Sequence, residues 1–571
     1  MTIAESDFRE IWMVDFEFVA PDGDLQTPVC MVARELFSGQ LIRLRREEML
    51  ALDRSPIDTG PDVLFCAYYA SAELKCYIQL GWPLPERVFD FLVEWKWLTN
   101  GSYCSLIAQH GYSLPYCLAS NHIRSITAEE KKDMRDLIMG GGPWTEDEMN
   151  AIVDYCQSDV DPLVELWKAW RGKIHLPSAI MRGRYTVAVA KMETTGVPID
   201  MEMLELLREN WDEVRAALIA TDQFGLFDEN NTFKHDRFRK LVVQNQWFWP
   251  TTAEGQFKTD EGTMKAMANR YPVLMPLYEL RRTLSEMKLN KLAVGPDGRN
   301  RCLLGPFGSK TGRNQPSNSK FIYGTARWLR HLVKPSEGRA IAYVDWSQQE
   351  LGIAAALSGD KNMLQAYQSG DPYLEFGKLL GAIPPHATKE SHPHERGLYK
   401  VVMLGVQFGM SEFGLAPRLG CMKMARHLLM NHREIFRDYW KWSEDQVNYS
   451  IAIGKYFLRD GWVFRSHPET RKRTYANFPI QGHGASMMRQ AACLLTEAGI
   501  NVCCPVHDAF LIEAAADEID DVVALTQQLM GDASEHLLKN LRLQSDAEIV
   551  KFPDRYVPES GHSLWETATK W

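Results

Sequence analysis

Two aspartates that are far apart in the chain are the first candidates for chemistry. Asp345 follows the apolar run 340–344, and Asp508 lies between two apolar runs in CCPVHDAFLIEA. A hairpin with His507 and Asp508 at its turn would present Asp508 beside Asp345. Two aspartates on neighbouring strands could hold two Mg²⁺ ions about 3.5–4 Å apart, which stabilise attacking and leaving oxygens together. Taken singly, an aspartate at the end of a strand is more often a helix cap or a turn residue.

A stripe of four side chains lies between these aspartates in the sequence. Arg396, Lys400, Leu404 and Phe408 are each four residues apart, so a helix would place them on nearly the same face. The two cations could hold the phosphates of a nucleoside triphosphate, with the apolar end against its base. The alternative is an amphipathic helix with two snorkelling cations, and the spacing alone favours that alternative.

A second acidic set lies near the amino terminus. Asp15 and Glu17 in MVDFEF would share one face of a strand, and Tyr155 and Asp159 would share one face of a helix. Alternating acids on a strand more often face solvent. This strand is otherwise strongly apolar, however, and buried paired acids are costly unless a metal compensates their charge.

The elements that would position these residues suggest several domains. An α/β unit opens with a strand over 11–19 and ends near residue 175 after the helical pattern DYCQSDVDPLVELWKAW. A mostly helical stretch covers about 180–290, and a segment rich in Gly, Pro, Ser and Asn follows it. Helices are predicted over 348–358 and 396–440, and the last hundred residues mix helix and strand.

Length and composition indicate an ordinary multidomain enzyme. The 571 residues suggest two to four domains of about 100–200 residues each. The eleven cysteines contain no CxxC pair or zinc-like cluster, so we expect reduced, mostly buried thiols. No apolar run of membrane-spanning length is present, and no basic-then-apolar leader begins the chain, so a cytosolic location without a membrane span is expected.

The net charge of −10 is unevenly distributed along the chain. Residues 1–175 hold 16 Lys and Arg against 28 Asp and Glu, whereas residues 281–344 hold 13 against 3, an excess of ten positive charges. Such an excess could neutralise a phosphate backbone. A solvated basic face explains the charge equally well.

Three sequence motifs carry a resemblance to family A DNA polymerases, the group of bacterial DNA polymerase I and many phage replicases. DWSQQEL resembles motif A, RGLYKVVMLGVQFGMS resembles motif B, and VHDAF resembles motif C, in the family's order. The implied fold class is α/β and α+β multidomain. An RNase H-like exonuclease domain (1–175) would precede a right-hand polymerase domain, with thumb and connecting region at 176–320, palm at 321–355 and 466–571, and fingers at 356–465.

The resemblance also implies roles for individual residues. Asp345 and Asp508 would bind two catalytic Mg²⁺ ions, for which Mn²⁺ may substitute, and Lys400 would protonate the departing pyrophosphate. Glu350 would crowd the ribose 2′ position and thereby favour deoxynucleotides. TGR at 311–313 and RTYANFPIQG resemble segments that contact the primer and template without reading sequence. The implied substrate-binding residues are Arg396, Lys400, Leu404, Phe408, Glu350, Gln348, Arg313, Arg473, Asn477, Gln481 and His507.

Three residues depart from the polymerase motifs. Ala509 replaces the glutamate usual in motif C, so the metal site loses a nearby carboxylate. Leu404 replaces an aromatic residue of motif B, which should alter sugar discrimination, speed or fidelity. Tyr373 stands where the family often has a histidine that contacts phosphate.

The amino-terminal segment resembles the proofreading domain of the same polymerases. DFE matches the first exonuclease motif and YCQSD the third, which implies Asp15, Glu17 and Asp159 as metal ligands and Tyr155 as the residue that orients the attacking water. In the second motif Glu73 replaces Asp and Tyr69 replaces Asn. Glu73 can hold the same cation with a longer arm, so nuclease activity is expected.

The expected function is therefore template-directed DNA synthesis with 3′→5′ proofreading. Primer-template DNA and dNTPs are the expected partners, together with a replicative helicase or primase and a single-strand-binding protein. The length and the missing 5′-nuclease domain resemble a monomeric phage or prophage replicase in the host cytoplasm. A catalytically weakened DNA-binding or exonuclease protein is the alternative. A single-subunit RNA polymerase is a third hypothesis, which Glu350 and the attached nuclease oppose.

Overall fold

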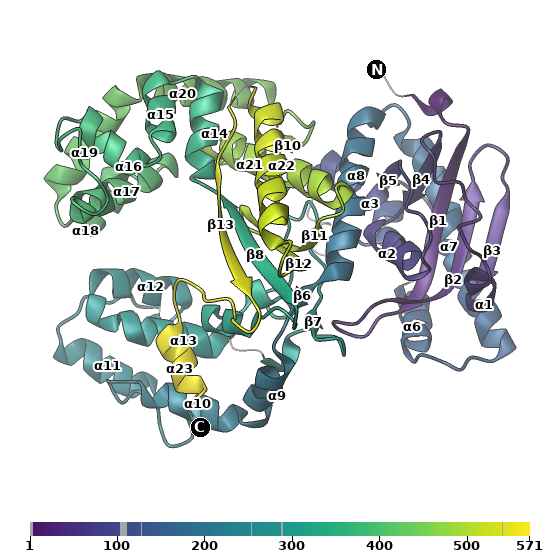
Figure 1. Cartoon of the computed structure of the whole chain (residues 1–571), viewed down its shortest axis with the longest axis horizontal. Coiled ribbons are helices and arrows are strands. Elements are labelled where there is room, and N and C mark those ends of the chain that lie inside the picture. Colours follow the sequence, from purple (N-terminus) through teal and green to yellow (C-terminus); the bar gives the residue numbers. More distant parts are fainter. Residues whose placement is uncertain are drawn as a thin grey trace.

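The two largest of the four sheets in the described residues organise the protein (Figure 1). The computed structural model describes residues 4–102, 111–126, 128–252, 254–286, 289–539 and 541–570. A five-stranded sheet forms the centre of an amino-terminal lobe (residues 4–170). A four-stranded sheet, here called the central sheet, lies between that lobe and two groups of helices.

The amino-terminal sheet is mixed, with strand order β3-β2-β1-β4-β5. Strands β1 to β3 are antiparallel, whereas β4 and β5 run parallel to β1. The helix α7 crosses β1 and β2. The strands are β1 (Glu10–Val19), β2 (Thr27–Glu35), β3 (Leu41–Arg45), β4 (Val63–Ala67) and β5 (Val88–Asp90), and the main helices are α2 (Ser71–Gln79), α3 (Phe91–Thr99), α6 (Ala128–Met139) and α7 (Glu146–Trp170).

The apolar character of β1 follows from the cover on both of its faces. Ile11 and Met13 belong to one buried cluster, whereas Trp12, Val14 and Phe16 belong to another on the opposite face. Strands buried on both sides are expected to be continuously apolar. Asp15 and Glu17 are therefore acidic side chains in a strand whose apolar residues pack into clusters on both faces.

The central sheet is antiparallel throughout, with strand order β11-β12-β8-β13. Its strands are β8 (Arg339–Trp346), β11 (Asn501–Val506), β12 (Ala509–Ala515) and β13 (Ser545–Lys551). Alternate residues Ala340, Ala342 and Val344 of β8 join the largest core cluster. That face is covered by α14 (Gln349–Ser358), α21 (Lys472–Glu497) and α22 (Ile519–Leu538). Ile341 and Tyr343 project to the other face.

Two helical groups lie on either side of the central sheet (Figure 1). The region 396–440, predicted to be helical, is divided into three helices and the start of a fourth, all in the second group. The first group contains α9 (Met201–Glu209), α10 (Trp211–Ala220), α11 (His235–Gln244), α12 (Glu261–Arg270) and α13 (Met275–Glu286), with the carboxyl-terminal α23 (His562–Ala568) against α10. The second contains α15 (Lys361–Gln368), α16 (Pro372–Leu379), α17 (Pro393–Gln407), α18 (Glu412–Leu419), α19 (Met422–Ile435) and α20 (Arg437–Ile453).

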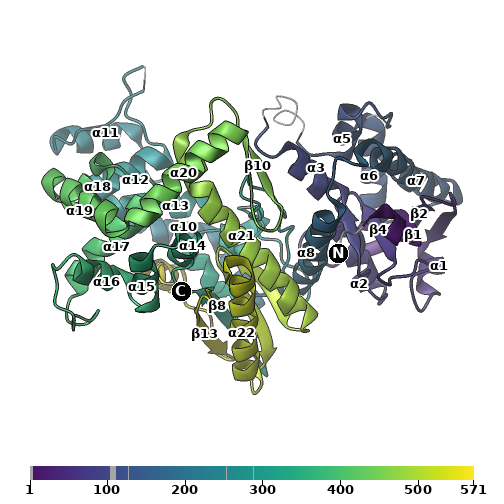
Figure 2. The same cartoon turned by 90° about the horizontal axis from the view of Figure 1, so that it is seen from above.

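Helix α8 (Leu176–Thr195) joins the amino-terminal lobe to the central sheet (Figure 2). It packs against β5 and α2 on one side and against α21 and β11 on the other. The approach to β5 is close, because a Cβ at Gly183 would lie 1.8 Å from the Val88 carbonyl oxygen. Arg182 donates two hydrogen bonds of 2.6 Å to Glu94, and both side chains are buried. This ion pair fixes the lobe to α8.

Within the described part of the chain, no helix is both long and apolar enough to cross a bilayer. The ten described cysteines are free of disulfides, and eight of them are buried.

We predict that Arg182→Met weakens the attachment of the amino-terminal lobe, because it leaves the Glu94 charge buried and uncompensated. The free energy of the unfolding transition that includes this lobe should fall by about 3–5 kcal/mol. Urea denaturation followed by circular dichroism measures it. Arg184→Met is the matched control, since Arg184 pairs with the exposed Glu497 and such pairs contribute less than about 1 kcal/mol. An equal fall in the free energy of unfolding in Arg182→Met and Arg184→Met would contradict the prediction.

Candidate active sites

The two aspartates of the central sheet are brought together at one end of β8 and β12. Asp345 is the second-to-last residue of β8, and the residue directly opposite it on β12 is Ala509. His507 and Asp508 form the turn between β11 and β12, with His507 in the left-handed region at φ 56°. The Trp346 backbone N–H donates to the Asp508 carbonyl oxygen over 3.3 Å. The structure thus contains the hairpin that the sequence predicts, while metal binding by its aspartate stays a prediction.

Burial disfavours ionisation of both carboxyl groups, and nearby like charges add to this effect at Asp345. Burial, together with the nearby Asp508, Asp546 and Glu559, raises the pKa of Asp345 to about 7. Burial also raises the pKa of Asp508. Asp345 Oδ1 is buried and has no hydrogen-bond partner. A divalent cation would satisfy this oxygen and neutralise the charge of the pair, so these residues fit a Mg²⁺ or Mn²⁺ site.

Asp546 was not found by sequence reasoning, although it lies beside Asp345. It occupies the position on β13 directly opposite Asp345, and its Oδ2 accepts a 2.6 Å hydrogen bond from the Ser347 hydroxyl. The signal in the sequence is the alternating pattern SDAEIVK near the carboxyl terminus. That pattern indicates a strand, but it does not reveal which strand pairs with it.

Glu350 and Arg313 meet near the aspartates. Glu350 lies in the first turn of α14, and Arg313 Nη2 is 3.4 Å from its Oε1. Burial raises the pKa of Glu350, and Arg313 partly opposes that rise. Gln348 precedes the helix in the left-handed region at φ 46°, which turns the chain sharply between Asp345 and Glu350.

Part of the positive charge in segment 281–344 is used inside the protein. Arg299 pairs with Glu513, Arg301 with Asp297, and Lys320 with Asp22 of the amino-terminal lobe, each at 2.6 Å. These three cations are structural. Asp297 is one of the three acids already counted in the segment, whereas Glu513 and Asp22 lie outside it. The pairing of Arg299 and Lys320 therefore reduces the excess of positive charge that a nucleic acid could meet.

The predicted stripe on α17 is present through Leu404. Arg396 pairs with Asp371, whose carboxylate caps α16. The cationic groups of Arg396 and Lys400 lie 5.3 and 5.9 Å from the centre of the Tyr373 ring. Tyr373 thus faces the two cations that the sequence analysis assigns to the triphosphate. Leu404 is 36% exposed on the same helix.

Phe408 lies just beyond the stripe, because α17 ends at Gln407 and Phe408 caps it. The Arg473 side chain approaches the next residue, with its Cγ 3.5 Å from where a Cβ on Gly409 would stand. Arg473, Asn477 and Gln481 all belong to α21, and their spacing of four places them along one face. Arg473 is exposed, whereas Asn477 and Gln481 are half-buried.

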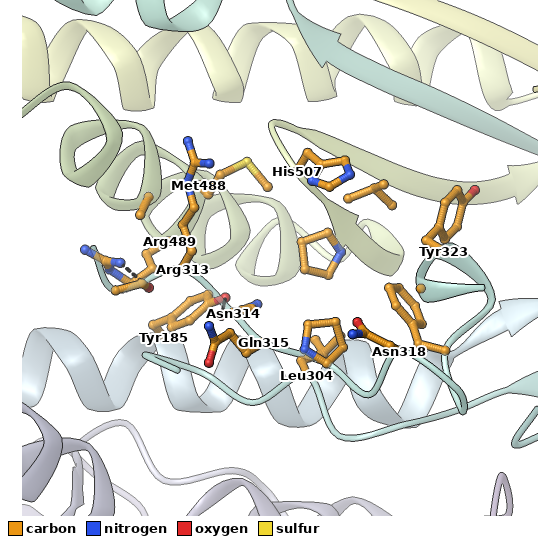
Figure 3. A pocket seen from close by; sticks show the side chains of 17 residues that line it. Tyr185, Leu304, Arg313, Asn314, Gln315, Asn318, Tyr323, Met488, Arg489 and His507 are labelled. Carbon is orange, nitrogen blue, oxygen red and sulfur yellow. Dashed lines mark hydrogen bonds between the residues drawn. The ribbon is translucent and has the colours of Figure 1, made fainter. Parts of the chain in front are cut away.

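A cavity of about 490 Å³ adjoins the hairpin turn (Figure 3). Arg313 and His507 line it, as predicted substrate-binding residues. Sequence reasoning missed the other polar lining residues, although the run RNQPSN next to TGR contains three of them. They are Tyr185, Asn314, Gln315, Asn318, Tyr323 and Arg489. Tyr185 donates a 2.9 Å hydrogen bond to Asn314, and Arg489 donates to the Gly312 carbonyl over 2.8 Å.

In the amino-terminal lobe, the ligand atoms of Asp15, Glu17 and Cys156 all lie within 4.8 Å of one another. Cys156 was missed by the sequence analysis, although it stands inside the motif YCQSD. Its thiol donates to Asp15 Oδ2 over 3.3 Å. Burial and then Asp159 raise the pKa of Asp15, which reaches about 8, and burial also raises the pKa of Glu17.

The other two predicted ligands of this lobe flank that cluster. Asp159 Oδ2 accepts a 2.5 Å hydrogen bond from Lys131 on α6, a residue that sequence reasoning also missed. Glu73 is buried on α2, and its Oε2 has no hydrogen-bond partner. Burial and then Asp15 raise the pKa of Glu73. Tyr155 is buried beside them, with Lys131 Nζ 5.8 Å from its ring centre.

Paired carboxylates of this kind fit two divalent metal ions, as in phosphatases, polymerases, nucleases and aminopeptidases. Residues 238–551, more than half of the chain, match the family model for DNA polymerase family A. The chain belongs to DNA polymerase family A.

Curated relatives agree with this membership. The chain is 25% identical over 380 residues to DNA polymerase I of Chloroflexus aurantiacus, which covers 61% of this chain and 40% of that protein. It is 25% identical over 398 residues to DNA polymerase I of Aquifex aeolicus, covering 65% and 67%. The thermostable DNA polymerase I of Thermus thermophilus is 26% identical over 376 residues, covering 60% and 44%. The match to the first of these spans less than half of its length.

The fold is similar to that of a solved polymerase domain. The POL domain of Pol1 from M. smegmatis, in complex with DNA primer-template and dNTP, aligns with a TM-score of 0.67. The alignment covers 95% of each chain at 18% identity. At this identity the similarity establishes the mixed α and β fold.

We predict that Asp508→Asn lowers the pKa of Asp345 from about 7, because it removes the strongest of the like charges that raise it. The pKa should stay above the ordinary value of 3.8, since burial is the largest cause of the shift. Carboxyl ¹³C NMR of the metal-free protein measures the titration. Asp58→Asn, in the exposed ion-pair group around Arg9, is the control and should leave Asp345 unchanged. An unaltered pKa in Asp508→Asn would contradict the geometry.

Proposed function

We propose that this chain is a DNA-directed DNA polymerase that extends a primer with dNTPs by two-metal phosphoryl transfer. The observation that carries the proposal is the convergence of Asp345 and Asp508 at one end of the central sheet, with a buried oxygen that lacks a partner. Membership of DNA polymerase family A supports it. The M. smegmatis domain with a similar fold binds primer-template and dNTP, and we propose the same ligands here.

In this proposal Asp345 and Asp508 hold the divalent ions. Bound Mg²⁺ or Mn²⁺ would supply Lewis-acid activation of the primer 3′-hydroxyl and stabilise charge on the leaving oxygen. Arg396 and Lys400 neutralise the triphosphate, and Lys400 donates a proton to the departing pyrophosphate. Tyr373 lies over both cations, so its hydroxyl can take part in the phosphate contact that a histidine makes in the family pattern.

Other residues position the substrates. Glu350, held by Arg313 beside the aspartates, excludes a ribose 2′-hydroxyl. Leu404, Phe408 and Gln348 contact the incoming nucleotide. Arg313, Arg473, Asn477, Gln481 and His507 contact the primer and template, and the cavity next to His507 accommodates that contact.

The domain assignment fits these roles. The central sheet with residues 321–355 and 466–571 is the palm, and the helices in 356–465 that carry Lys400 are the fingers. The helical group within 176–320 is the thumb. The α23 helix returns from the palm to pack on α10 of that thumb.

We further propose that residues 1–175 are an RNase H-like 3′→5′ exonuclease that proofreads the primer end. The mixed sheet with β1 at its centre presents Asp15 and Glu17 as a compact pair. With Glu73 and Asp159 they would hold two metal ions, and Tyr155 would orient the attacking water. The unpartnered, buried Glu73 oxygen supports a cation there.

The separation of the two sites makes the proposal testable. Asp345→Ala and Asp508→Ala should each reduce primer extension at least about 10²–10³-fold, since transition-state charge loses its stabilisation. Both variants should still excise a mismatched primer end. Asp15→Ala should remove excision and keep extension. Extension and excision on one mismatched, labelled primer-template measure both activities.

Loss of both activities in any one of these variants would contradict separate sites. If the native protein binds DNA and fails to extend with Mg²⁺ or Mn²⁺, the weakened DNA-binding or exonuclease protein becomes the correct account. Replacing dNTPs with rNTPs in the same assay tests the RNA polymerase hypothesis. Helicase, primase and single-strand-binding partners remain predictions from the resemblance.

A further inference from the structure

The acidic end of the central sheet contains a carboxylate outside the polymerase motifs. In the register of the sheet, Asp345 is directly opposite Ala509 on one side and Asp546 on the other. Directly opposed residues of antiparallel strands project from the same face. Positions 509, 345 and 546 therefore form one row across three strands, on the face that also carries Ile341 and Tyr343.

Only one of the two residues that flank Asp345 in this row is charged. Ala509 is completely buried and offers no oxygen, although motif C usually places a glutamate there. Asp546 on the other side is exposed, and the bond from Ser347 fixes its Oδ2. Ser347 follows Asp345 by two residues, so the same segment holds both carboxylates in place.

We propose that Asp546 is a third carboxylate of the polymerase metal site and supplies the negative charge that Ala509 lacks. The inference rests on the proposed polymerase function. A Mg²⁺ ion held by one or two carboxylates keeps several water ligands. Asp546 lies beside Asp345, where it can accept hydrogen bonds from such waters and orient them. Partners of this kind change metal affinity about 10–100-fold in other proteins.

Mn²⁺ binding, followed through the EPR signal of the free ion, tests the proposal without relying on activity. All variants carry Asp15→Ala and Glu17→Ala, so that the amino-terminal cluster does not contribute, and primer-template DNA is present. We expect Asp546→Asn to weaken Mn²⁺ binding about tenfold. Adding Ala509→Glu to Asp546→Asn should restore most of the affinity, because it returns a carboxylate to the row beside Asp345.

Asp520→Asn is the matched control, since Asp520 is exposed and pairs with Lys551 of the same strand β13. It should leave Mn²⁺ binding unchanged. Equal affinity in Asp546→Asn and its parent, or failure of Ala509→Glu to recover binding, would overturn the role of Asp546. Unchanged binding in Asp345→Ala would instead overturn the proposed polymerase site. If Asp345→Ala loses Mn²⁺ binding and Asp546→Asn does not, the role of Asp546 is overturned while the proposed polymerase site stands.

Discussion

Confinement of like charges in a buried place is the constraint on which both proposed sites depend. Asp345 is forced to share the end of a sheet with Asp508 and Asp546, and its pKa is raised to about 7. Asp15 lies in an apolar strand, and burial together with the nearby Asp159 raises its pKa to about 8. Carboxyl groups held in this way are unstable as anions without a compensating cation. The same electrostatic cost therefore makes each cluster a good candidate site for a divalent metal ion.

The rest of the structure keeps these groups from moving apart. Asp345 is fixed by strands on both sides, since β12 and β13 pair with β8 along nearly its whole length. The left-handed Gln348 precedes α14 three residues after Asp345, so Glu350 returns to the proposed site. Helix α8 ties the amino-terminal lobe to this core through the buried pair of Arg182 and Glu94.

The sequence predicts the pieces of the fold that depend on local pattern. The apolar strand at 11–19, the helix that ends at Trp170, and the hairpin around Asp508 all follow from periodicity and turn residues. The candidate aspartates followed from their place at strand ends, and the family from three motifs in order. Asp546, Lys131 and Cys156 were missed for a physical reason. Their contacts join segments 28 to 201 residues apart, and pairing between distant strands and helices leaves no local signal.

Charge counts along the chain were a weaker guide than motifs. The excess in segment 281–344 suggested a phosphate-binding surface, yet Arg299 and Lys320 are paired with Glu513 and Asp22, acids outside that segment. For Tyr373, by contrast, the structure supports a role that the sequence motif left in doubt. It departs from the family pattern in sequence, but its ring centre lies 5.3 and 5.9 Å from the cationic groups of Arg396 and Lys400, the residues proposed to contact the triphosphate.

The most direct test of the central claim is a crystal structure with primer-template DNA and Mn²⁺, in which anomalous scattering locates the ion. The account predicts an anomalous peak shared by the carboxylates of Asp345 and Asp508. A peak bound by only one of them, or carboxylates turned to different surfaces with no shared ion, would contradict it.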